Sequence, residues 1–235
     1  MPDLIESAPA VALAVYAHPD DPEVSCGGTL ARWSQAGCAV HVLVCTRGEK
    51  GSLDPTTDTV ELAVRRSAEM DAAANVLGAA AIHRLGHEDG ELGTAASLRR
   101  EIVATIRSVR PAVVLCPDPT AVFFGDSYFN HADHRTAGWA TLDAVSPAAA
   151  NPHYFPDAGP PHRVGRVLLS GTLEPDVWVD IGATLEAKID ALYCHRSQLD
   201  EAGEFLREAL THRAEEAGEL AGVRYAEGFR GLTLG

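Results

Sequence analysis

The chain has 235 residues, of which 46% are hydrophobic and 22% are charged, the composition of an ordinary globular protein. It carries 19 Lys and Arg against 33 Asp and Glu, a formal net charge of −14. This excess of acid excludes nucleic acid and anionic membrane surfaces as expected partners, because both attract basic patches. No change of composition marks a linker, which predicts a single domain over residues 1–235.

The five cysteines are widely spaced, odd in number and without a C-x-x-C pair. This pattern argues against a disulfide framework and against a cysteine zinc site. The first residues lack the positive segment of a signal peptide. The longest nearly apolar run, 8–17, is too short for a membrane span, which needs roughly 20 residues. These features predict a protein of the reducing cytoplasm.

Segments with the patterns of strands and helices alternate along the chain. In chain order they predict a strand at 11–16, a helix at 24–35, a strand at 39–45, a helix at 59–77 ending at Gly78, a strand at 82–85, a helix at 95–109 and a strand at 112–116. They continue with a helix at 131–145, strands at 166–170 and 177–181, and helices at 184–195 and 204–217. This order predicts an α/β fold, Rossmann-like and doubly wound, with a mostly parallel sheet and helices on both faces.

Two long segments break the alternation. Residues 117–130 contain four aromatic side chains, and residues 146–165 are rich in proline and glycine. Loops of this length without secondary structure are uncommon and are frequently functional.

The first polar cluster follows the first predicted strand, as Tyr-Ala-His-Pro-Asp-Asp-Pro-Glu over residues 16–23. Ligands of open α/β sheets bind outside the carboxyl ends of the strands. Pro19 favours an extended His18, so we expect a stiff turn here and not the start of a helix. His18 and Asp21 can converge on one point while Asp20 points elsewhere, so one carboxylate could bind a metal and the other face a reacting group. A solvated polar turn is the alternative for this stretch alone.

The second cluster is Asn-His-Ala-Asp-His over residues 130–134. Asn130 is expected to cap the following helix, with Asp133 as its acidic partner. His131 and His134 then lie on one face of the first turn, at i and i+3. A surface cap with one histidine packed on the sheet is the alternative.

Together, the two clusters supply His and Asp ligands for a metal, with a carboxylate and an imidazole to spare for acid–base work. This inventory is typical of hydrolysis by a metal-activated water. No G-x-G-x-x-G follows the first strand, which argues against a nicotinamide-binding domain.

Seven short motifs resemble the LmbE-like (PIG-L-type) zinc-dependent N-acetylglucosaminyl de-N-acetylase family. They are AHPDDPE at 17–23, CGGTL at 26–30, TRGEKG at 46–51, RSAE at 66–69, GHEDG at 86–90, NHADH at 130–134 and HRSQ at 195–198. The resemblance therefore covers most of the chain.

The resemblance implies a role for each matching position. It implies metal ligands at His18, Asp21 and His134, a general base at Asp20, and an oxyanion-stabilising histidine at His131. It also implies that three residues contact the substrate, namely Arg66, Glu49 and Asp89. Some relatives have an active-site tyrosine where this chain has Phe129, and Tyr128 is one position further away. His195 lies either in the site or at a subunit contact.

The implied function is removal of an acetyl group from an N-acetylated amino sugar or sugar-like conjugate, a small molecule. The expected cofactor is Zn²⁺, with Fe²⁺ or another divalent metal as alternatives. Asp20 takes a proton from the attacking water and returns it to the leaving amine, while protonated His131 and the metal hold the oxyanion. The alternatives are an amidase acting on a larger thiol–sugar conjugate and a non-catalytic metal- or sugar-binding domain. Assembly as a homo-oligomer stays open.

Overall fold

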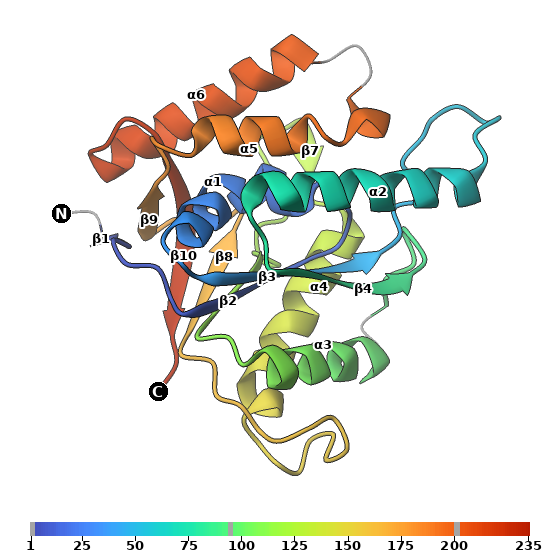
Figure 1. Ribbon diagram of the computed structural model, residues 1–235, viewed down its shortest axis with the longest axis vertical. Coiled ribbons are helices and arrows are strands. Elements are labelled where there is room, and N and C mark those ends of the chain that lie inside the picture. The colour runs from blue at the N-terminus through green and yellow to red at the C-terminus, as the bar shows by residue number, and fades with distance from the viewer. Residues whose placement is uncertain (1–2, 94–95, 200–202) are drawn as a thin grey trace.

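The computed structural model describes residues 3–93, 96–199 and 203–235, and a twisted sheet runs through its centre (Figure 1). In spatial order the strands are β1 (Asp3–Leu4), β9 (Val177–Asp180), β10 (Ala226–Thr233), β8 (Arg166–Ser170), β5 (Val113–Pro117), β2 (Val11–Tyr16), β3 (Ala39–Thr46) and β4 (Ala81–His87). β10 runs antiparallel to β8 and β9, and the other neighbours pair in parallel. The predicted α/β fold with a mostly parallel sheet is confirmed.

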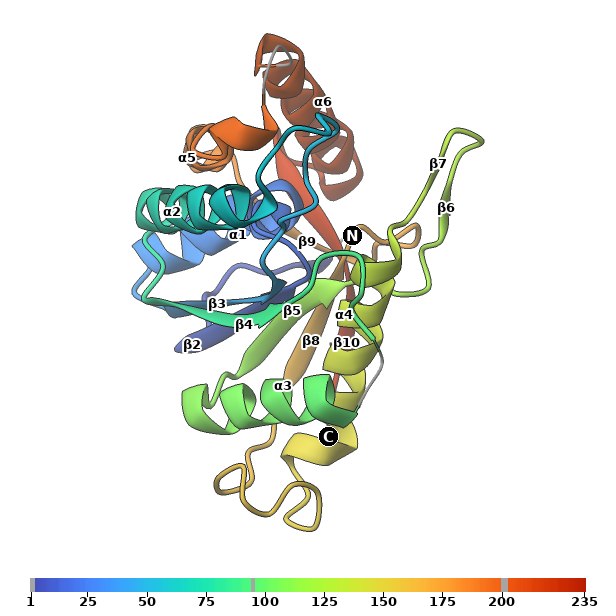
Figure 2. The same ribbon diagram turned by 90° about the vertical axis from the view of Figure 1, so that its right-hand side faces the viewer.

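Helices cover both faces of the sheet (Figures 1 and 2). One face carries α1 (Asp21–Gln35), α2 (Thr59–Leu77), α5 (Leu185–Leu192) and α6 (Gly203–Ala221). The other carries α3 (Ala96–Val109), α4 (Ala132–Asp143) and η1 (Ala144–Ala149), a π-helical continuation of α4. Among the described residues, no helix is long and apolar enough to cross a membrane.

The position of the central strand β2 between two helix layers explains why its sequence is apolar throughout. Ala12, Ala14 and Tyr16 belong to the core beneath α1, α2 and α5, whereas Leu13 and Val15 belong to the core beneath α3 and α4. A strand with a helix layer on each face buries both sets of side chains. This explains why the central strands were predicted from apolar runs.

Several predicted elements agree with the structure closely. The strands at 11–16 and 166–170 and the helix at 59–77 have the predicted bounds, and Gly78 adopts the left-handed conformation at the end of α2 (φ 71°). The start of α1 was predicted wrongly, because the helix begins at Asp21 and not at Val24. Asp20 itself reverses the chain (φ 100°), so the turn leads directly into the helix.

Among the described residues, the sequence did not predict the strands β1 and β10, a small hairpin or the 3₁₀ turn η2 (Arg196–Gln198). β10 contains two glycines and two charged residues, Glu227 and Arg230, so no apolar run marks it, and its neighbours β8 and β9 position it instead. The hairpin β6 (Phe123–Phe124) and β7 (Tyr128–Phe129) forms within the predicted aromatic loop and projects from the body of the molecule (Figure 2).

The second long segment, 146–165, packs around one buried arginine. Arg107 of α3 is only 2% exposed. Its guanidinium donates hydrogen bonds to six backbone carbonyls, those of Ala148, Ala149, Asn151, Tyr154, Phe155 and Gly159. The length of this segment thus has a structural explanation.

The two adjacent glycines of the CGGTL motif allow α1 to lie close to its neighbours. A Cβ on Gly28 would lie 2.8 Å from the side chain of Ile181, and one on Gly27 would lie 3.2 Å from Lys188. Close packing at the start of α1 holds the polar turn before it in place. All five cysteines are free, and all except Cys194 are buried.

Candidate active site

The candidate site lies where the carboxyl ends of the central parallel strands meet. The chain leaves β2 toward β3 on one side, and later places β5 on the other side of β2. Such a switch point is where open α/β sheets bind ligands. His18, Asp20 and Asp21 follow β2, and Asn130–His134 lead into α4.

The three predicted metal ligands converge on one point. His18 Nδ1 lies 3.1 Å from His134 Nε2, which lies 3.1 Å from Asp21 Oδ1, and Asp21 Oδ2 lies 3.4 Å from His18 Nδ1. Around zinc, ligands at about 2.0–2.2 Å in a tetrahedron are roughly 3.3–3.6 Å apart. We call these three residues the donor cluster; its spacing and its N and O atoms fit a divalent metal.

Neighbouring side chains orient both imidazoles of the donor cluster. His18 Nε2 lies 3.0 Å from Asp89 Oδ1 and 3.3 Å from Asp133 Oδ2, and His134 Nδ1 donates to Asn130 Oδ1 at 3.0 Å. Metal-binding histidines usually donate their second ring N–H in this way. The ring nitrogens that face the cluster are thereby left available as ligands.

Asp133 has a different role from the predicted helix cap. Its carboxylate is buried and accepts from the backbone N–H of Gly90 and Leu92, at 2.8 and 3.2 Å. The N-cap of α4 is His131 and not Asn130, because His131 Nδ1 accepts from the N–H of Asp133 at 3.2 Å. The predicted capping pair was therefore wrong, since both members are used to position the donor cluster.

The site favours positive charge between its carboxylates. Burial alone would lower the pKa of His18, but hydrogen bonds to Asp133, Asp21 and Asp89 raise it to about 12. Burial alone would raise the pKa of Asp21, but His134 and His18 hold it well below its usual range. A cation bound among these groups would gain the same attraction.

Asp20 points away from the donor cluster, as predicted. Its Oδ2 accepts from Arg66 Nη2 at 3.0 Å, and its side chain is 22% exposed. Burial and the neighbouring Asp21 raise the pKa of Asp20 to about 7, although Arg66 opposes the shift. A carboxylate with a pKa near neutrality can both take and return a proton.

Arg66 turns inward behind Asp20, with only 4% of its side chain exposed. It donates to the carbonyls of Pro19 and Gly48, at 2.6 and 2.8 Å, in addition to Asp20. The adjacent Arg65 points to solvent and pairs with Glu69 at 3.1 Å. Arg66 therefore holds the turn that carries Asp20, and its predicted contact with substrate is untested.

The other two predicted substrate contacts are also engaged within the protein. Glu49 Oε1 accepts from Arg47 at 2.8 Å and from the N–H of Asp89 at 3.3 Å. Asp89 bonds to His18 and accepts from the N–H of Lys50 at 3.2 Å. Glu49 and Asp89 are each 7% exposed. Like Arg66, both residues therefore make their polar contacts within the protein.

His131 lies beside the donor cluster, with its ring 5.0 Å from that of His18. Since Nδ1 accepts a backbone N–H, the neutral ring carries its proton on Nε2. Burial and the nearby His18 lower the pKa of His131, so the expectation of a protonated ring is corrected to a neutral donor. His18, His131 and Asp133 form a second possible metal set, but both oxygens of Asp133 already accept backbone hydrogen bonds.

His195 is fully buried, which rules out the subunit contact for its ring. Its Nε2 lies 3.4 Å from Glu23 Oε2, in the first turn of α1. The rest of the HRSQ motif joins α2 and the loop after β3, because Ser197 bonds to Glu69 and Gln198 donates to the carbonyl of Gly51. Residues of this motif therefore link α2 to the loop after β3.

A cavity of about 460 Å³ opens beside the donor cluster. It is lined by Asp21 and His134 and by groups for which no sequence motif exists, namely Ser25, Phe124, Tyr128, Ser170 and Arg213. Tyr128 reaches the cavity from the hairpin, whereas Phe129 is 68% exposed and does not line it. The sequence offered no signal for Arg213, since α6 is about 80 residues away from the second polar cluster.

These features define an α/β protein with a two-histidine, one-aspartate donor cluster at the switch point of its sheet. Residues 13–145 match the PIG-L family model, described as GlcNAc-PI de-N-acetylase, so the chain belongs to the PIG-L family. It is 37% identical over 222 residues to a diacetylchitobiose deacetylase of Thermococcus kodakarensis, covering 93% of this chain and 81% of the relative.

Two further proteins are similar over most of their lengths. A 1D-myo-inositol 2-acetamido-2-deoxy-alpha-D-glucopyranoside deacetylase of Rhodococcus jostii is 32% identical over 257 residues, covering 85% of each chain. The solved N,N′-diacetylchitobiose deacetylase from Pyrococcus horikoshii, in complex with its inhibitor MPG, superposes with a TM-score of 0.88 at 30% identity. That match covers 96% of this chain and 84% of the other.

Proposed function

We propose that this protein is a metal-dependent deacetylase that hydrolyses the amide of an N-acetylated amino sugar or sugar-like conjugate. The observation that carries the proposal is the donor cluster together with Asp20, a carboxylate beside the cluster but outside it. The names of the similar proteins support the reaction and the class of substrate. The fold alone would not support a particular reaction, because one fold serves many reactions.

In this mechanism His18, Asp21 and His134 would hold the metal, with Zn²⁺ expected and Fe²⁺ the alternative. When bound, such a metal polarises a carbonyl and makes water acidic enough to attack near neutral pH. Asp20 accepts a proton from the attacking water, with its carboxylate oriented by Arg66. It then gives this proton to the nitrogen of the leaving amine as the amide C–N bond breaks, which yields acetate and a free amine.

The neutral His131 donates from Nε2 to the carbonyl oxygen as negative charge develops there. A donor of this kind typically contributes about 10²–10³ in rate. Asp133 holds the ring through its backbone N–H, which bonds to Nδ1 and keeps the proton on the other nitrogen.

The test is release of acetate from N-acetylglucosamine and N,N′-diacetylchitobiose, before and after treatment with a chelator and on return of Zn²⁺ or Fe²⁺. Activity should disappear with the metal and return with it. Asp20→Asn should keep the metal but lose roughly 10²–10⁴-fold in kcat, the usual contribution of general acid–base catalysis.

Arg65→Ala is the matched control, because Arg65 is next to Arg66 in α2 but faces solvent. Metal bound without release of acetate from either sugar would make the protein a binding domain. Loss of metal from Asp20→Asn would instead make Asp20 a ligand.

A further inference from the structure

A separate cavity of about 320 Å³ lies between α2 and the edge strands β3 and β4, which Figure 1 shows beneath that helix. Its apolar lining is Val44 of β3, Ala63, Val64 and Met70 of α2, and Pro19 of the turn after β2. Among the described residues, it shares no lining residue with the cavity beside the donor cluster. Pockets for small molecules usually measure about 300–1,000 Å³ and are mostly apolar, so this cavity has the size and character of a ligand site.

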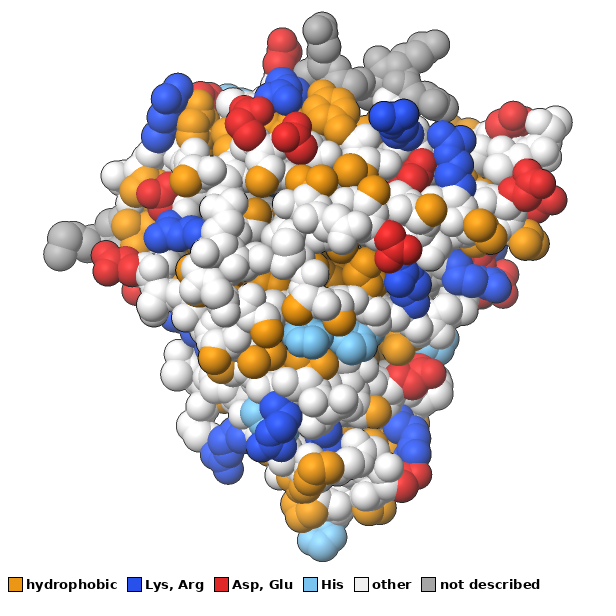
Figure 3. All heavy atoms as spheres, viewed as in Figure 1, with side chains coloured by type: hydrophobic (Ala, Val, Ile, Leu, Met, Phe, Trp, Pro, Cys, Tyr) orange, Lys and Arg blue, Asp and Glu red, His pale blue; other side chains and the backbone are white. Residues whose placement is uncertain are grey.

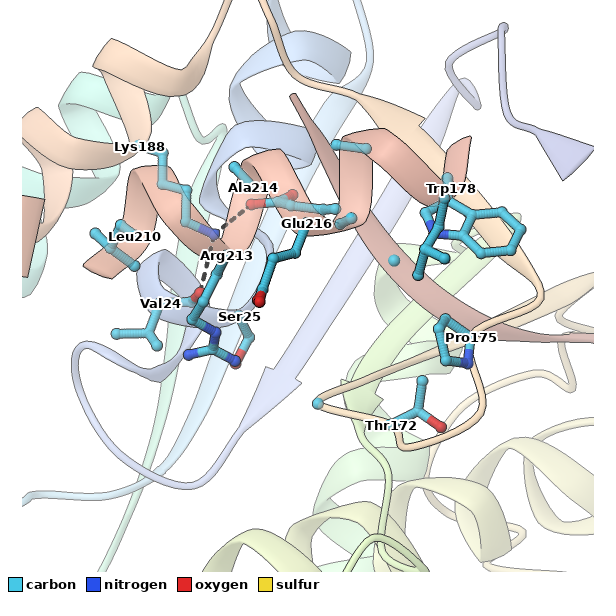
Figure 4. A pocket seen from close by; sticks show the side chains of 16 residues that line it. Val24, Ser25, Thr172, Pro175, Trp178, Lys188, Leu210, Arg213, Ala214 and Glu216 are labelled. Carbon is cyan, nitrogen blue, oxygen red and sulfur yellow. Dashed lines mark hydrogen bonds and ion pairs between the residues drawn. The ribbon is translucent and has the colours of Figure 1, made fainter. Parts of the chain in front are cut away.

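The charge of this cavity differs from that of the cavity drawn in Figure 4, between α1, α6 and β10. There, Glu216 lines the wall, and the buried Lys188 is already paired with Glu227 at 2.5 Å. The described lining of the cavity under α2 instead includes two arginines, Arg47 and Arg84, and no acidic residue. In a chain of net charge −14, such a cavity favours an anionic ligand.

Thr46 contributes a hydroxyl that has no partner in the protein. The residue ends β3, lines the cavity and is only 4% exposed. Its Oγ1 is buried and makes no hydrogen bond with any residue that the structure describes. Leaving a buried hydroxyl unbonded is unfavourable, so a ligand that bonds to Thr46 removes this cost.

A bulge bends the edge of the sheet at this cavity. Val44 of β3 pairs with Arg84 of β4. Two residues further along β3, Thr46 pairs with His87, which is three residues further along β4. Gly86 lies in this longer stretch of β4, has a φ of 74° and lines the cavity. Bulges of this kind kink a strand and redirect its side chains, and they are frequent beside functional sites.

The two arginines keep donors that a ligand can use. Arg84 donates only through Nη2, to Asp71 at 2.7 Å and to the carbonyl of Ser67 at 3.2 Å. Arg47 donates through Nη2 to Glu49 at 2.8 Å. The remaining N–H groups of both guanidiniums make no hydrogen bond within the described part of the chain. A carboxylate fits these donors, because its two oxygens accept hydrogen bonds from guanidinium and hydroxyl groups alike.

We infer that this cavity is a second ligand site, for a small carboxylic acid with an apolar body. The body lies against side chains of β3 and α2, and the carboxylate accepts from Arg84 and from the Thr46 hydroxyl. Pro19 lines the cavity and directly precedes Asp20, so the occupant contacts the turn that carries the proposed base. The ligand is an effector and not a substrate, and its binding does not depend on the proposed function.

The methionines of the chain provide a local readout of binding. There are two of them, Met1 and Met70, and Met70 lines the cavity. With methionine labelled with ¹³C in its methyl group, the Met70→Leu variant identifies the Met70 signal in the NMR spectrum. Titration of the intact protein with phenylacetate should shift this signal until it saturates. Phenylacetamide, which is neutral and of the same shape, should bind about tenfold more weakly, because hydrogen bonds to charged groups contribute more.

Substitutions separate the groups that make the site. Arg84→Gln and Thr46→Val should each raise the Kd for phenylacetate by about tenfold, the usual effect of losing one such hydrogen bond. Arg65→Gln is the matched control, because it removes the same charge from the surface of α2 but Arg65 does not line the cavity. Ala63→Phe fills the cavity from α2 and should abolish the shift of the Met70 signal.

Kinetics separate this site from the donor cluster, where a carboxylate could also bind a metal. Phenylacetate should not compete with the N-acetyl sugar. It should instead change kcat through the turn and leave KM unaltered.

Competitive inhibition without a shift of the Met70 signal would place the acid at the donor cluster and overturn the inference. Equal binding of phenylacetamide, or an unchanged Kd in both Arg84→Gln and Thr46→Val, would overturn the assignment of a carboxylate. A shifted Met70 signal with unchanged kcat would overturn the link to the turn of Asp20. If phenylacetate binds as expected but no sugar yields acetate, the proposed function alone fails.

Discussion

The inner site around the donor cluster and the rim of the cavity beside it differ in how their polar groups are satisfied. Beneath the donor cluster, Arg66, Asp89 and Asp133 are buried, and each makes two or more hydrogen bonds or close ion contacts. At the rim of the same cavity, Arg213 is exposed and makes no hydrogen bond or ion pair with a described residue, and three aromatic side chains of the hairpin, Phe123, Tyr128 and Phe129, are exposed.

This difference suggests a division between chemistry and selection. Groups that hold a metal or a proton must be held within a fraction of an ångström, so they need rigid supports. Groups that select a substrate can be exposed and without partners in the free protein, because their hydrogen bonds form when the substrate binds. On the side of the molecule that Figure 3 shows, basic and acidic side chains of the described residues are scattered and form no basic patch.

The largest effect should come from the donor cluster itself. His134→Ala removes one of three ligands, so the metal content should fall from about one ion per chain to near zero, and deacetylation should fall to background. Elemental analysis of the purified variant measures this.

Asn130, which bonds to His134, offers a control with a smaller expected effect. Asn130→Ala keeps all three ligands but removes the acceptor for His134 Nδ1, so metal affinity should weaken by roughly 10–100-fold. If His134→Ala protein is as metal-loaded as the wild type, the donor cluster is wrongly assigned.

The supports of the inner site should affect stability and turnover together. Arg66→Ala leaves two carbonyls and the Asp20 carboxylate without their donor. The loss should be about 3 kcal/mol, the low end for a broken buried pair, because Asp20 is still 22% exposed. This corresponds to roughly 6–12 °C in Tm for a chain of this size.

The kinetic effect separates support from substrate binding. A displaced turn should lower kcat, whereas the loss of a substrate contact would raise KM alone. Arg65→Ala should change the free energy of unfolding by no more than about 0.5 kcal/mol, as for an exposed i,i+4 pair. An Arg66→Ala protein with normal Tm and a raised KM would show that Arg66 contacts the substrate and does not mainly support the turn.

Much of the inner site could be predicted from sequence, because its ligands lie within two short motifs that follow parallel strands or start a helix. The roles of Arg66, Asn130 and Asp133 could not, since each depends on which backbone groups packing brings near. Arg213 had no signal at all, because its place at the cavity depends on how α6 packs beside β10. The central parallel strands β2, β3, β5 and β8 were predicted from apolar runs, whereas β10 carries no such pattern.

The pH dependence should report Asp20. The base must be ionised, and its pKa is raised to about 7, so kcat/KM should fall as the pH drops below this value, by about tenfold per unit. A bound cation stabilises the carboxylate, which places the midpoint at 7 or lower. A profile that is flat between pH 4 and 8 would exclude Asp20 as the base.

The smallest effect should come from the exposed hairpin β6–β7, whose Phe124 and Tyr128 line the cavity beside the donor cluster. Phe129 is 68% exposed and does not line this cavity, although the neighbouring Tyr128 and the buried Asn130 do. Phe129→Ala should therefore change the free energy of unfolding by less than about 0.5 kcal/mol, as exposed substitutions usually do, and leave kcat/KM unchanged. Tyr128→Ala should alter kcat/KM at similar stability, because it changes the wall beside His134. Denaturant unfolding and acetate release measure both variants. A loss of activity in Phe129→Ala that equals the loss in Tyr128→Ala would show that the hairpin acts as one unit. The distinction between a rigid inner site and an exposed rim that tolerates substitution would then be wrong.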